Sequence, residues 1–277
     1  VDFGRIIVGQ TVTGLSTDIS APITPNNFYT NPVLETTGGS DPRVSVSTGA
    51  TEATFNQFNG STIASRGVSG TFPQAGNFIG SIPLSVRAEG LVGEGTYSLS
   101  VPYVVEAVRQ RQVQATPVNF GRVVAGGTVS GFQTQISSPA TVDDLYTRPV
   151  LAASGATGLP VTVGADTEAR TFDRQDGATL STRNVSAAFT APGPQSGSVP
   201  LLVTPEGLTG EGNYTVGVDW NANVVLDRQI NATPVNFGRV FTGVSVNRTS
   251  NLSTTGNDDT YTRVRLNAGS YTQGPVG

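Results

Sequence analysis

Val1-Asp2-Phe3-Gly4-Arg5 opens the chain and decides its organisation, because nearly the same five residues return at Val118 and at Val235, 117 residues apart each time. The register holds along the whole copy: the stretch 89–97 matches 206–214, and Ala-Thr-Pro ends both copies, at 115–117 and 232–234. A period this long exceeds the roughly 20–50 residues of a solenoid repeat and suits one independently folding domain. We therefore predict domains at 1–116 and 117–233, followed by a partial third repeat at 234–277.

Each copy has the pattern of short β-strands. Apolar and polar residues alternate in Val44-Ser45-Val46-Ser47 and in Tyr97-Ser98-Leu99-Ser100-Val101, which is typical of strands with one buried face. Gly, Pro, Asn and Asp separate seven or eight such strands at a spacing of about 8–12 residues, which favours a sandwich or barrel. No stretch carries apolar residues at helical spacing over three turns. The sequence predicts an all-β protein with almost no helix.

The join between the copies contains no Gly/Ser linker. Residues 111–120 read Arg-Gln-Val-Gln-Ala-Thr-Pro-Val-Asn-Phe, so we expect the last strand of one domain to run through Thr116-Pro117 into the first strand of the next. Proline fixes φ and keeps the preceding residue extended. A short, stiff joint follows, unlike a flexible coil, and the expected shape is a rod of sandwiches placed end to end.

These features carry a resemblance. Val-x-Phe-Gly-Arg followed by Ile or Val opens each copy, Gly9 lies four residues after Arg5, and a later strand ends in the Ala-Thr-Pro join. In this the chain resembles the immunoglobulin-like repeats of large bacterial surface proteins, including the choice-of-anchor repeats, which are distantly similar to abnormal-spindle-type domains. The resemblance implies tandem immunoglobulin-like β-sandwiches and an exported bacterial protein at the cell surface.

The composition excludes several chemistries. The 277 residues include no Cys, His, Met or Lys, so all sixteen basic residues are Arg. Disulfides, thiolate metal sites, Ser-His-Asp triads, Schiff bases and Lys–Asn crosslinks are therefore ruled out. The net charge of −4 argues against nucleic acid as a partner. We predict that the protein is not an enzyme. Because there is no Met, Val1 is not a translation start, and we expect a window on a longer array.

Paired glutamates are the candidate metal ligands. Glu89 and Glu94 recur as Glu206 and Glu211 among glycines, and carboxylate oxygens suit Ca²⁺. Calcium is the one candidate cofactor. The alternative interpretation is a turn in which glycines supply positive φ and the carboxylates are solvated or accept backbone N–H bonds. Recurrence in both copies favours this role in the fold.

Arginine and proline mark the predicted interdomain joints. Arg5, Arg122 and Arg239 follow Phe-Gly in the three copies, and an arginine there can pair with an acid of the preceding domain or lie along its own sheet. The predicted joint residues are Arg5, Pro117, Arg122, Pro234 and Arg239. One exposed pair contributes only about 0–1 kcal/mol, so it would orient the joint more than stabilise it.

The partial third copy holds too few strands to bury a sandwich core. Three explanations stay open: a window on a longer array, completion by strands of another subunit, or a domain boundary near residue 43 of each copy. We predict an extracellular structural protein, a repeat-array subunit of a cell-surface fibre, filament or surface layer. Its expected partners are other copies of itself, head to tail or side by side. The alternative is an adhesion or carbohydrate-binding surface module with glycans as ligands.

Overall fold

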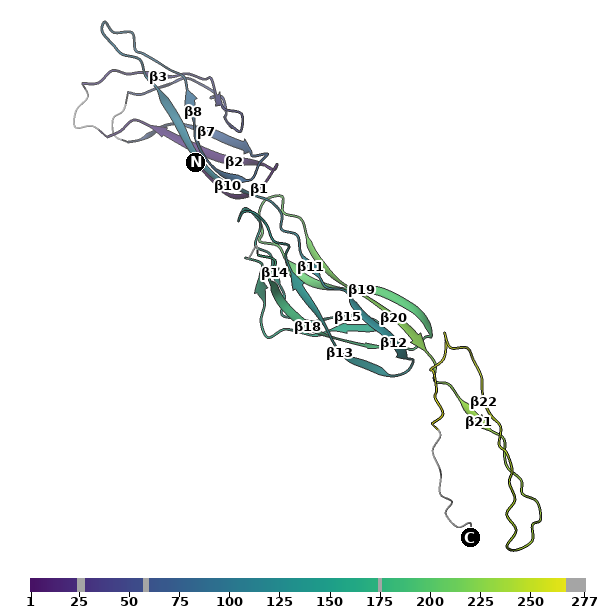
Figure 1. The fold of residues 1–277 in the computed structure, drawn as a ribbon. Coiled ribbons are helices and arrows are strands. Elements are labelled where there is room, and N and C mark those ends of the chain that lie inside the picture. Colours follow the sequence, from purple (N-terminus) through teal and green to yellow (C-terminus); the bar gives the residue numbers. More distant parts are fainter. Residues whose placement is uncertain (24–27, 57–59, 174–175, 268–277) are drawn as a thin grey trace.

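The computed structural model describes residues 1–23, 28–56, 60–173 and 176–267. Every regular element in these residues is a β-strand. Two groups of strands, from β1 to β10 and from β12 to β20, follow one another along an elongated molecule, and the last strands lie at its far end (Figure 1). The all-β, immunoglobulin-like sandwich predicted from the sequence is confirmed.

Repeat 1 consists of two packed layers. In one layer, parallel pairing of β1 with β10 joins the beginning and the end of the repeat, and β10 pairs antiparallel with β8. In the other layer the strand order is β2-β7-β5-β4. The bounds are β1 Asp2–Ile7, β10 Leu99–Val108, β8 Gly76–Leu84, β2 Thr11–Ser20, β7 Thr62–Thr71, β5 Val44–Val46 and β4 Gly39–Ser40. Short strands β3 Val33–Leu34, β6 Ala53–Thr54 and β9 Val86–Arg87 form a further sheet.

Repeat 2 has the same layers with longer sheets. The orders are β12-β20-β19-β14-β17 and β11-β13-β18-β16-β15. The bounds in the first sheet are β12 Val118–Val124, β20 Tyr214–Val225, β19 Gly193–Thr204, β14 Val150–Leu151 and β17 Arg170–Thr171. In the second sheet they are β11 Gln114–Ala115, β13 Thr128–Ser137, β18 Thr179–Ala188, β16 Val161–Val163 and β15 Ala156–Gly158. The unbroken β19 occupies the positions that β8 and β9 share in repeat 1.

Two separate apolar cores lie between these layers. One is drawn from residues 3–107 and the other from residues 118–224. In β10, Val101, Tyr103 and Val105 are buried while the residues between them are more exposed, as the period of two requires. Trp220 replaces Tyr103 in the second core and is only 6% exposed. Trp220 is therefore a core residue of repeat 2.

The third repeat contributes little regular structure. Within residues 234–267 the only strand is β22 (Leu252–Thr254), which pairs with β21 (Ile230–Ala232). Its large apolar side chains, Phe237 and Phe241 among them, are exposed, as expected for a fragment too small to enclose a core. The described residues contain no helix that would be long and apolar enough to cross a membrane.

Candidate inter-repeat interface

The segment that follows β10 leaves repeat 1 and packs on repeat 2. The backbone of Arg109 accepts a hydrogen bond from the N–H of Thr147 at 2.9 Å and donates one to the carbonyl of Leu145 at 2.8 Å. Five residues later β11 pairs antiparallel with β13 of repeat 2. The predicted boundary at 116 assigns residues 109–115 to repeat 1, whereas their contacts are with repeat 2. The periodicity gives the length of a repeat but does not show at which residue the structural unit begins. It therefore cannot place this boundary.

Arg111 is the most enclosed side chain of this segment, at 1% exposed. Its backbone N–H donates to Thr147 Oγ1 at 3.0 Å and to the Tyr214 hydroxyl at 3.1 Å. Its Nε donates to the Thr147 carbonyl at 2.8 Å and its Nη1 to Ser138 Oγ at 3.3 Å. The guanidinium also lies 5.7 Å from the ring centroid of Tyr146. Burial lowers the pKa of Arg111, and the surrounding oxygens and the ring accommodate the buried charge.

Arg5 crosses the joint from the repeat 1 side. Its Nε donates to Glu106 of the same repeat at 3.1 Å, its Nη1 binds the carboxylate of Glu206 in repeat 2, and its Nη2 donates to the Tyr146 carbonyl at 2.7 Å. Burial opposes the charge of Arg5, but the hydrogen bonds and charges of Glu206 and Glu106 raise its pKa. Sequence reasoning left two roles open, a pair with an acid of the preceding domain or a position along its own sheet. The structure instead pairs Arg5 with the following domain, because β1 ends beside the start of repeat 2.

The opposite face of this joint is formed by the loop 206–212 of repeat 2, which contains the paired glutamates Glu206 and Glu211. The Glu206 carboxylate also accepts the backbone N–H of Arg148 at 2.7 Å, which holds it in place for Arg5. Gly210, at φ +80°, lies so close to Gln10 of repeat 1 that an added Cβ would fall 2.1 Å from Gln10 Cγ. Only glycine adopts this φ without strain and leaves room for the contact.

The second glutamate of the motif caps the turn before it. Glu94 accepts backbone N–H bonds from Glu89, Gly90 and Leu91 at 2.7–3.0 Å, and Glu211 does the same for residues 206–208. No group of three or more potential metal-ligating side chains occurs in the part of the chain that the structure describes. The geometry matches the turn interpretation of the four glutamates. Calcium binding by them stays a prediction.

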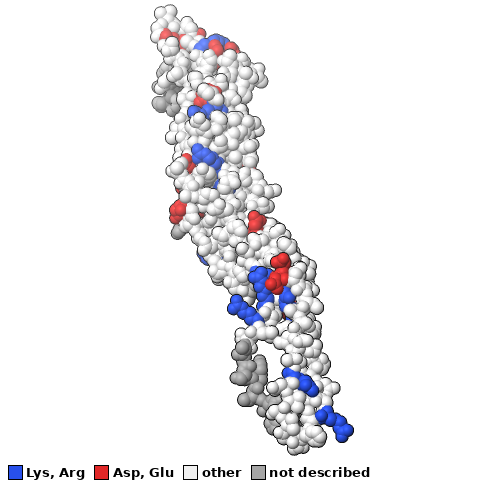
Figure 2. All heavy atoms as spheres, turned by 45° about the vertical axis from the view of Figure 1, so that its right-hand side comes forward, with Lys and Arg blue, Asp and Glu red and all other residues white. Residues whose placement is uncertain are grey.

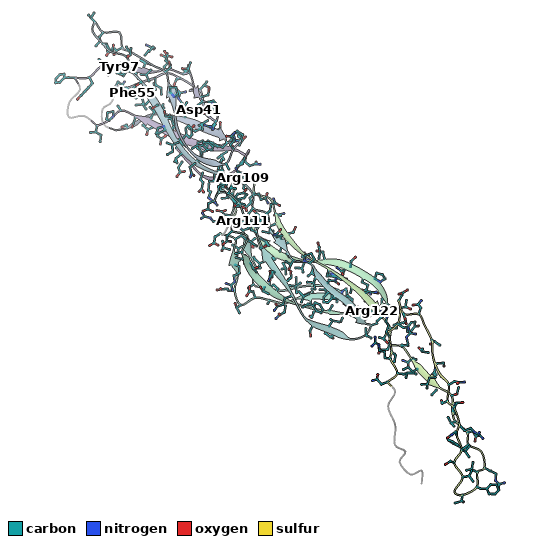
Figure 3. The ribbon with its side chains drawn as sticks, viewed as in Figure 1. Asp41, Phe55, Tyr97, Arg109, Arg111 and Arg122 are labelled. Atoms are coloured by element: carbon teal, nitrogen blue, oxygen red, sulfur yellow. The ribbon has the colours of Figure 1, made fainter. Side chains whose placement is uncertain are left out.

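Several of these contacts recur at the next joint. Arg228, the counterpart of Arg111, donates its backbone N–H to Thr262 Oγ1 at 3.0 Å and its Nε to the Thr262 carbonyl at 2.7 Å. Its guanidinium lies 5.9 Å from the ring centroid of Tyr261. Arg122, the counterpart of Arg5, donates to the Tyr261 carbonyl at 2.6 Å. Arg109 and Arg111 lie at the first joint and Arg122 at the second (Figure 3).

Three predicted joint residues lie elsewhere. Pro117 lies between β11 and β12, which are both strands of repeat 2, so it carries the chain from one sheet to the other inside the repeat. The adjacent Thr116 is held by β13, its N–H donating to the Gln135 carbonyl at 2.9 Å. Pro234 follows Thr233, which makes the matching bond to Asn251 at 3.0 Å. Arg239 is exposed in the third repeat.

Sequence reasoning missed Arg111 and its partner Thr147. Arginine is rarely buried, so composition offers no reason to place one inside a joint. The recurrence of Arg at 111 and 228, each with a later Tyr-Thr pair in the next copy, was the available signal. Two further buried arginines were also missed, Arg183 and its repeat 1 counterpart Arg66; Nη1 of Arg183 donates to the Ala153 carbonyl at 2.8 Å.

The face drawn in Figure 2 is mostly uncharged, and its acidic and basic side chains form small separate groups. On this face no stripe of positive charge follows the molecule, as nucleic-acid binding would require.

No protein-family model and no curated protein matches the chain. Solved structures of similar fold include CfaE, the adhesive subunit of the CFA/I fimbria of enterotoxigenic Escherichia coli, 11% identical over 80% of this chain and 97% of that one, with a TM-score of 0.26. The C-terminal domain of the Streptococcus agalactiae polypeptide BspA is 10% identical over 79% and 94%, with a TM-score of 0.28. The Clostridium thermocellum CbhA fibronectin(III)-like modules are 11% identical over 82% and 91%, at 0.25. These likenesses are too weak to assign the chain to a family.

Proposed function

We propose that this protein is an extracellular structural protein of the bacterial cell surface, a repeat-array subunit of a fibre, filament or surface layer without enzymatic activity. The observation that carries the proposal is the joint. An arginine bound to the following repeat, a Tyr-Thr pair and a second arginine reaching the same tyrosine carbonyl occur at both junctions. A junction built twice in the same way sets the angle between successive domains.

The contacts at the first joint favour a stiff connection. A flexible linker leaves its backbone solvated, whereas residues 109–116 are bonded to repeat 2 through Leu145, Thr147 and the edge of β13. Arg5 and Gln10 add contacts from the body of repeat 1 to the 206–212 loop. Bending this joint requires breaking several of these contacts at once. The repeats therefore keep a fixed end-to-end length and transmit tensile load.

Cohesion within such an array has to be non-covalent. Without Cys or Lys, neither disulfides nor isopeptide bonds can carry load. The two apolar cores and the long antiparallel pairs, β19 with β20 and β13 with β18, supply the resistance to unfolding. Other copies of this chain are the proposed partners in the assembly.

Negative-stain electron microscopy of the purified chain tests the proposal. We expect particles with one narrow distribution of inter-repeat angles and, at raised concentration, fibres or sheets with a regular repeat. Monodisperse monomers with a broad angle distribution would overturn the structural role. If such monomers also bound specific sugars on a glycan array, the adhesion alternative would replace it.

A further inference from the structure

An apolar cavity of about 290 Å³ lies at the end of repeat 1 that faces away from repeat 2. Phe55 and Tyr97 mark its position (Figure 3). The rest of its lining is Ser20, Ala21, Pro22, Tyr29, Thr30, Pro32, Val86, Ser98 and Leu99. None of these side chains is charged. The polar feature of the lining is a hydroxyl pair, Thr30 Oγ1 hydrogen-bonded to the Tyr97 hydroxyl.

In repeat 2 the matching residues form the place where Arg111 is buried. Four residues that Arg111 contacts there, Ser138, Thr147, Tyr214 and Tyr146, each lie 117 positions after a residue that lines the repeat 1 cavity. Their repeat 1 counterparts are Ala21, Thr30, Tyr97 and Tyr29. The Thr147–Tyr214 hydroxyl pair repeats the Thr30–Tyr97 pair. Repeat 1 therefore presents the hydroxyl pair and the tyrosine ring of this receptor in a preformed state.

The side chains of the repeat 2 site, which holds Arg111, are less exposed than the matching side chains of the open repeat 1 site. Tyr214 is 6% exposed beneath the connecting segment, and Tyr97 is 36% exposed. Phe172 is buried, whereas its counterpart Phe55 is only partly buried. The strands around the two sites match, so the difference in burial is attributed to the docked segment. In repeat 2 the segment covers the rings of Tyr214 and Phe172, and in repeat 1 nothing equivalent covers Tyr97 and Phe55 among the described residues.

Two further features of repeat 1 match the docked state. In repeat 2, β11 pairs with β13 at Ser137 and Ile136, and β2, the counterpart of β13, is the edge strand of its sheet. Glu206 receives Arg5 across the joint, and its counterpart Glu89 is positioned by the same kind of bond, from the N–H of Asn31 at 2.8 Å. An open strand edge and an acceptor for a second arginine thus flank the cavity.

We propose that this cavity is a docking site for the connecting segment of another repeat of this type, an extended peptide of the chemistry Arg-Gln-Arg-Gln-Val in residues 109–113. Its second arginine enters between Tyr29 and Tyr97, its backbone N–H donates to the Thr30–Tyr97 hydroxyl pair, and the residues after it pair with β2. Two differences reduce the match: Ala21 replaces Ser138, which removes one side-chain hydrogen bond, and Asn56 replaces Asp173, whose charge favours the Arg111 guanidinium. The inference rests on the internal comparison of the repeats and holds whether or not the chain forms a surface fibre.

The test places the segment directly before repeat 1. A full chain preceded by the sequence of residues 107–117 puts the segment before Val1 just as it stands before Val118. We expect amide hydrogen exchange in residues 28–34 and 97–101 to slow by at least about tenfold relative to the unextended chain, since hydrogen bonds to a charged group are among the stronger ones. Exchange in the repeat 2 core strands reports whether the fold is intact.

The matched control is the same extension with Arg111→Ala in the added copy only. It keeps the length and the strand-pairing residues but removes the guanidinium, and we expect most of the protection to be lost. A Tyr97→Phe variant of the extended chain keeps the ring and removes the hydroxyl acceptor, and it should give intermediate protection. Equal exchange in the extended and unextended chains, or equal protection with arginine and alanine, would overturn the proposal.

Discussion

Arg111 and Thr147 are joined by two hydrogen bonds across the junction of the repeats, from the Arg111 N–H to Thr147 Oγ1 at 3.0 Å and from Arg111 Nε to the Thr147 carbonyl at 2.8 Å. Arg228 and Thr262 repeat both bonds at the next junction, at 3.0 and 2.7 Å. Each arginine belongs to the connecting segment, and its backbone N–H and its side chain both donate to a threonine of the following repeat. The joint and the end of the sandwich core are built as one structure.

Arg111→Ala should destabilise repeat 2 and loosen the joint. It removes several hydrogen bonds of a buried cation and leaves a cavity beside Tyr146, so we expect a loss of roughly 2–4 kcal/mol in the free energy of unfolding. Urea denaturation followed by Trp220 fluorescence measures this loss, because Trp220 lies in the core of repeat 2. Arg87→Ala is the control: Arg87 pairs with Glu52 in repeat 1, both side chains are about half exposed, and a change below about 1 kcal/mol is expected. Equal losses in the two variants would contradict the role of Arg111.

Glu206→Gln should widen the range of inter-repeat orientations. The change removes the charge that Arg5 meets in repeat 2, in a pair whose side chains are only 15% and 21% exposed. Because the chain has no native cysteine, spin labels at Ser16→Cys and Thr182→Cys report one distance across the joint by double electron–electron resonance. We expect a broader distribution for Glu206→Gln.

Glu89→Gln is the matched control for that experiment. Glu89 occupies the same motif position in repeat 1 and accepts the corresponding backbone N–H, from Asn31, but it lies at the end of repeat 1 away from this joint. The distance distribution should therefore stay that of the unaltered chain. Broadening by both substitutions would show that the motif acts through the stability of its own turn, and not through Arg5.

Acid should leave the Glu94 turn intact until the pH is very low. Burial opposes the charge of Glu94, but bonds from three backbone N–H groups and the Tyr97 hydroxyl lower its pKa from 4.5 to about 2. A depressed folded-state pKa means that the contribution to stability is present above the unfolded value and is lost as the pH falls through the folded value. The side-chain carboxyl carbon of Glu94, assigned by its absence in Glu94→Gln, should titrate with a midpoint near 2. A midpoint at the ordinary value would show that the cap does not form.

Chelation should not change the melting of either repeat. The carboxylates of Glu94 and Glu211 already accept several backbone N–H bonds within their turns. Differential scanning calorimetry in EDTA and in millimolar calcium chloride should therefore give superimposable transitions. A midpoint that rises with calcium, and falls back after Glu94→Gln or Glu211→Gln, would instead establish the calcium site that the paired glutamates suggest.

The repeat and the two-residue alternation were sufficient to predict the sandwich. Buried Val101, for example, lies at an apolar position of that alternation. The joint was harder, because a periodic sequence carries no mark of where its structural unit begins. Arg111, which the predicted boundary assigns to repeat 1, packs in repeat 2, and Pro117, predicted to lie at the joint, connects two sheets inside repeat 2. Which acid Arg5 would meet depended on the relative placement of the domains, which no local pattern encodes.

Gly210→Ala compared with Gly93→Ala separates the fold of the motif from its contact across the joint. Both glycines have positive φ, +80° and +83°, so an alanine strains either turn by about 1 kcal/mol. Only at Gly210 would the new Cβ also meet Gln10 of repeat 1, whereas nothing lies within 4 Å of one at Gly93. We expect similar small losses of stability from both substitutions. The distance between the labels at positions 16 and 182 should shift only for Gly210→Ala, because Gln10 must move away. An unchanged distance there would mean that the 206–212 loop does not set the orientation of the repeats.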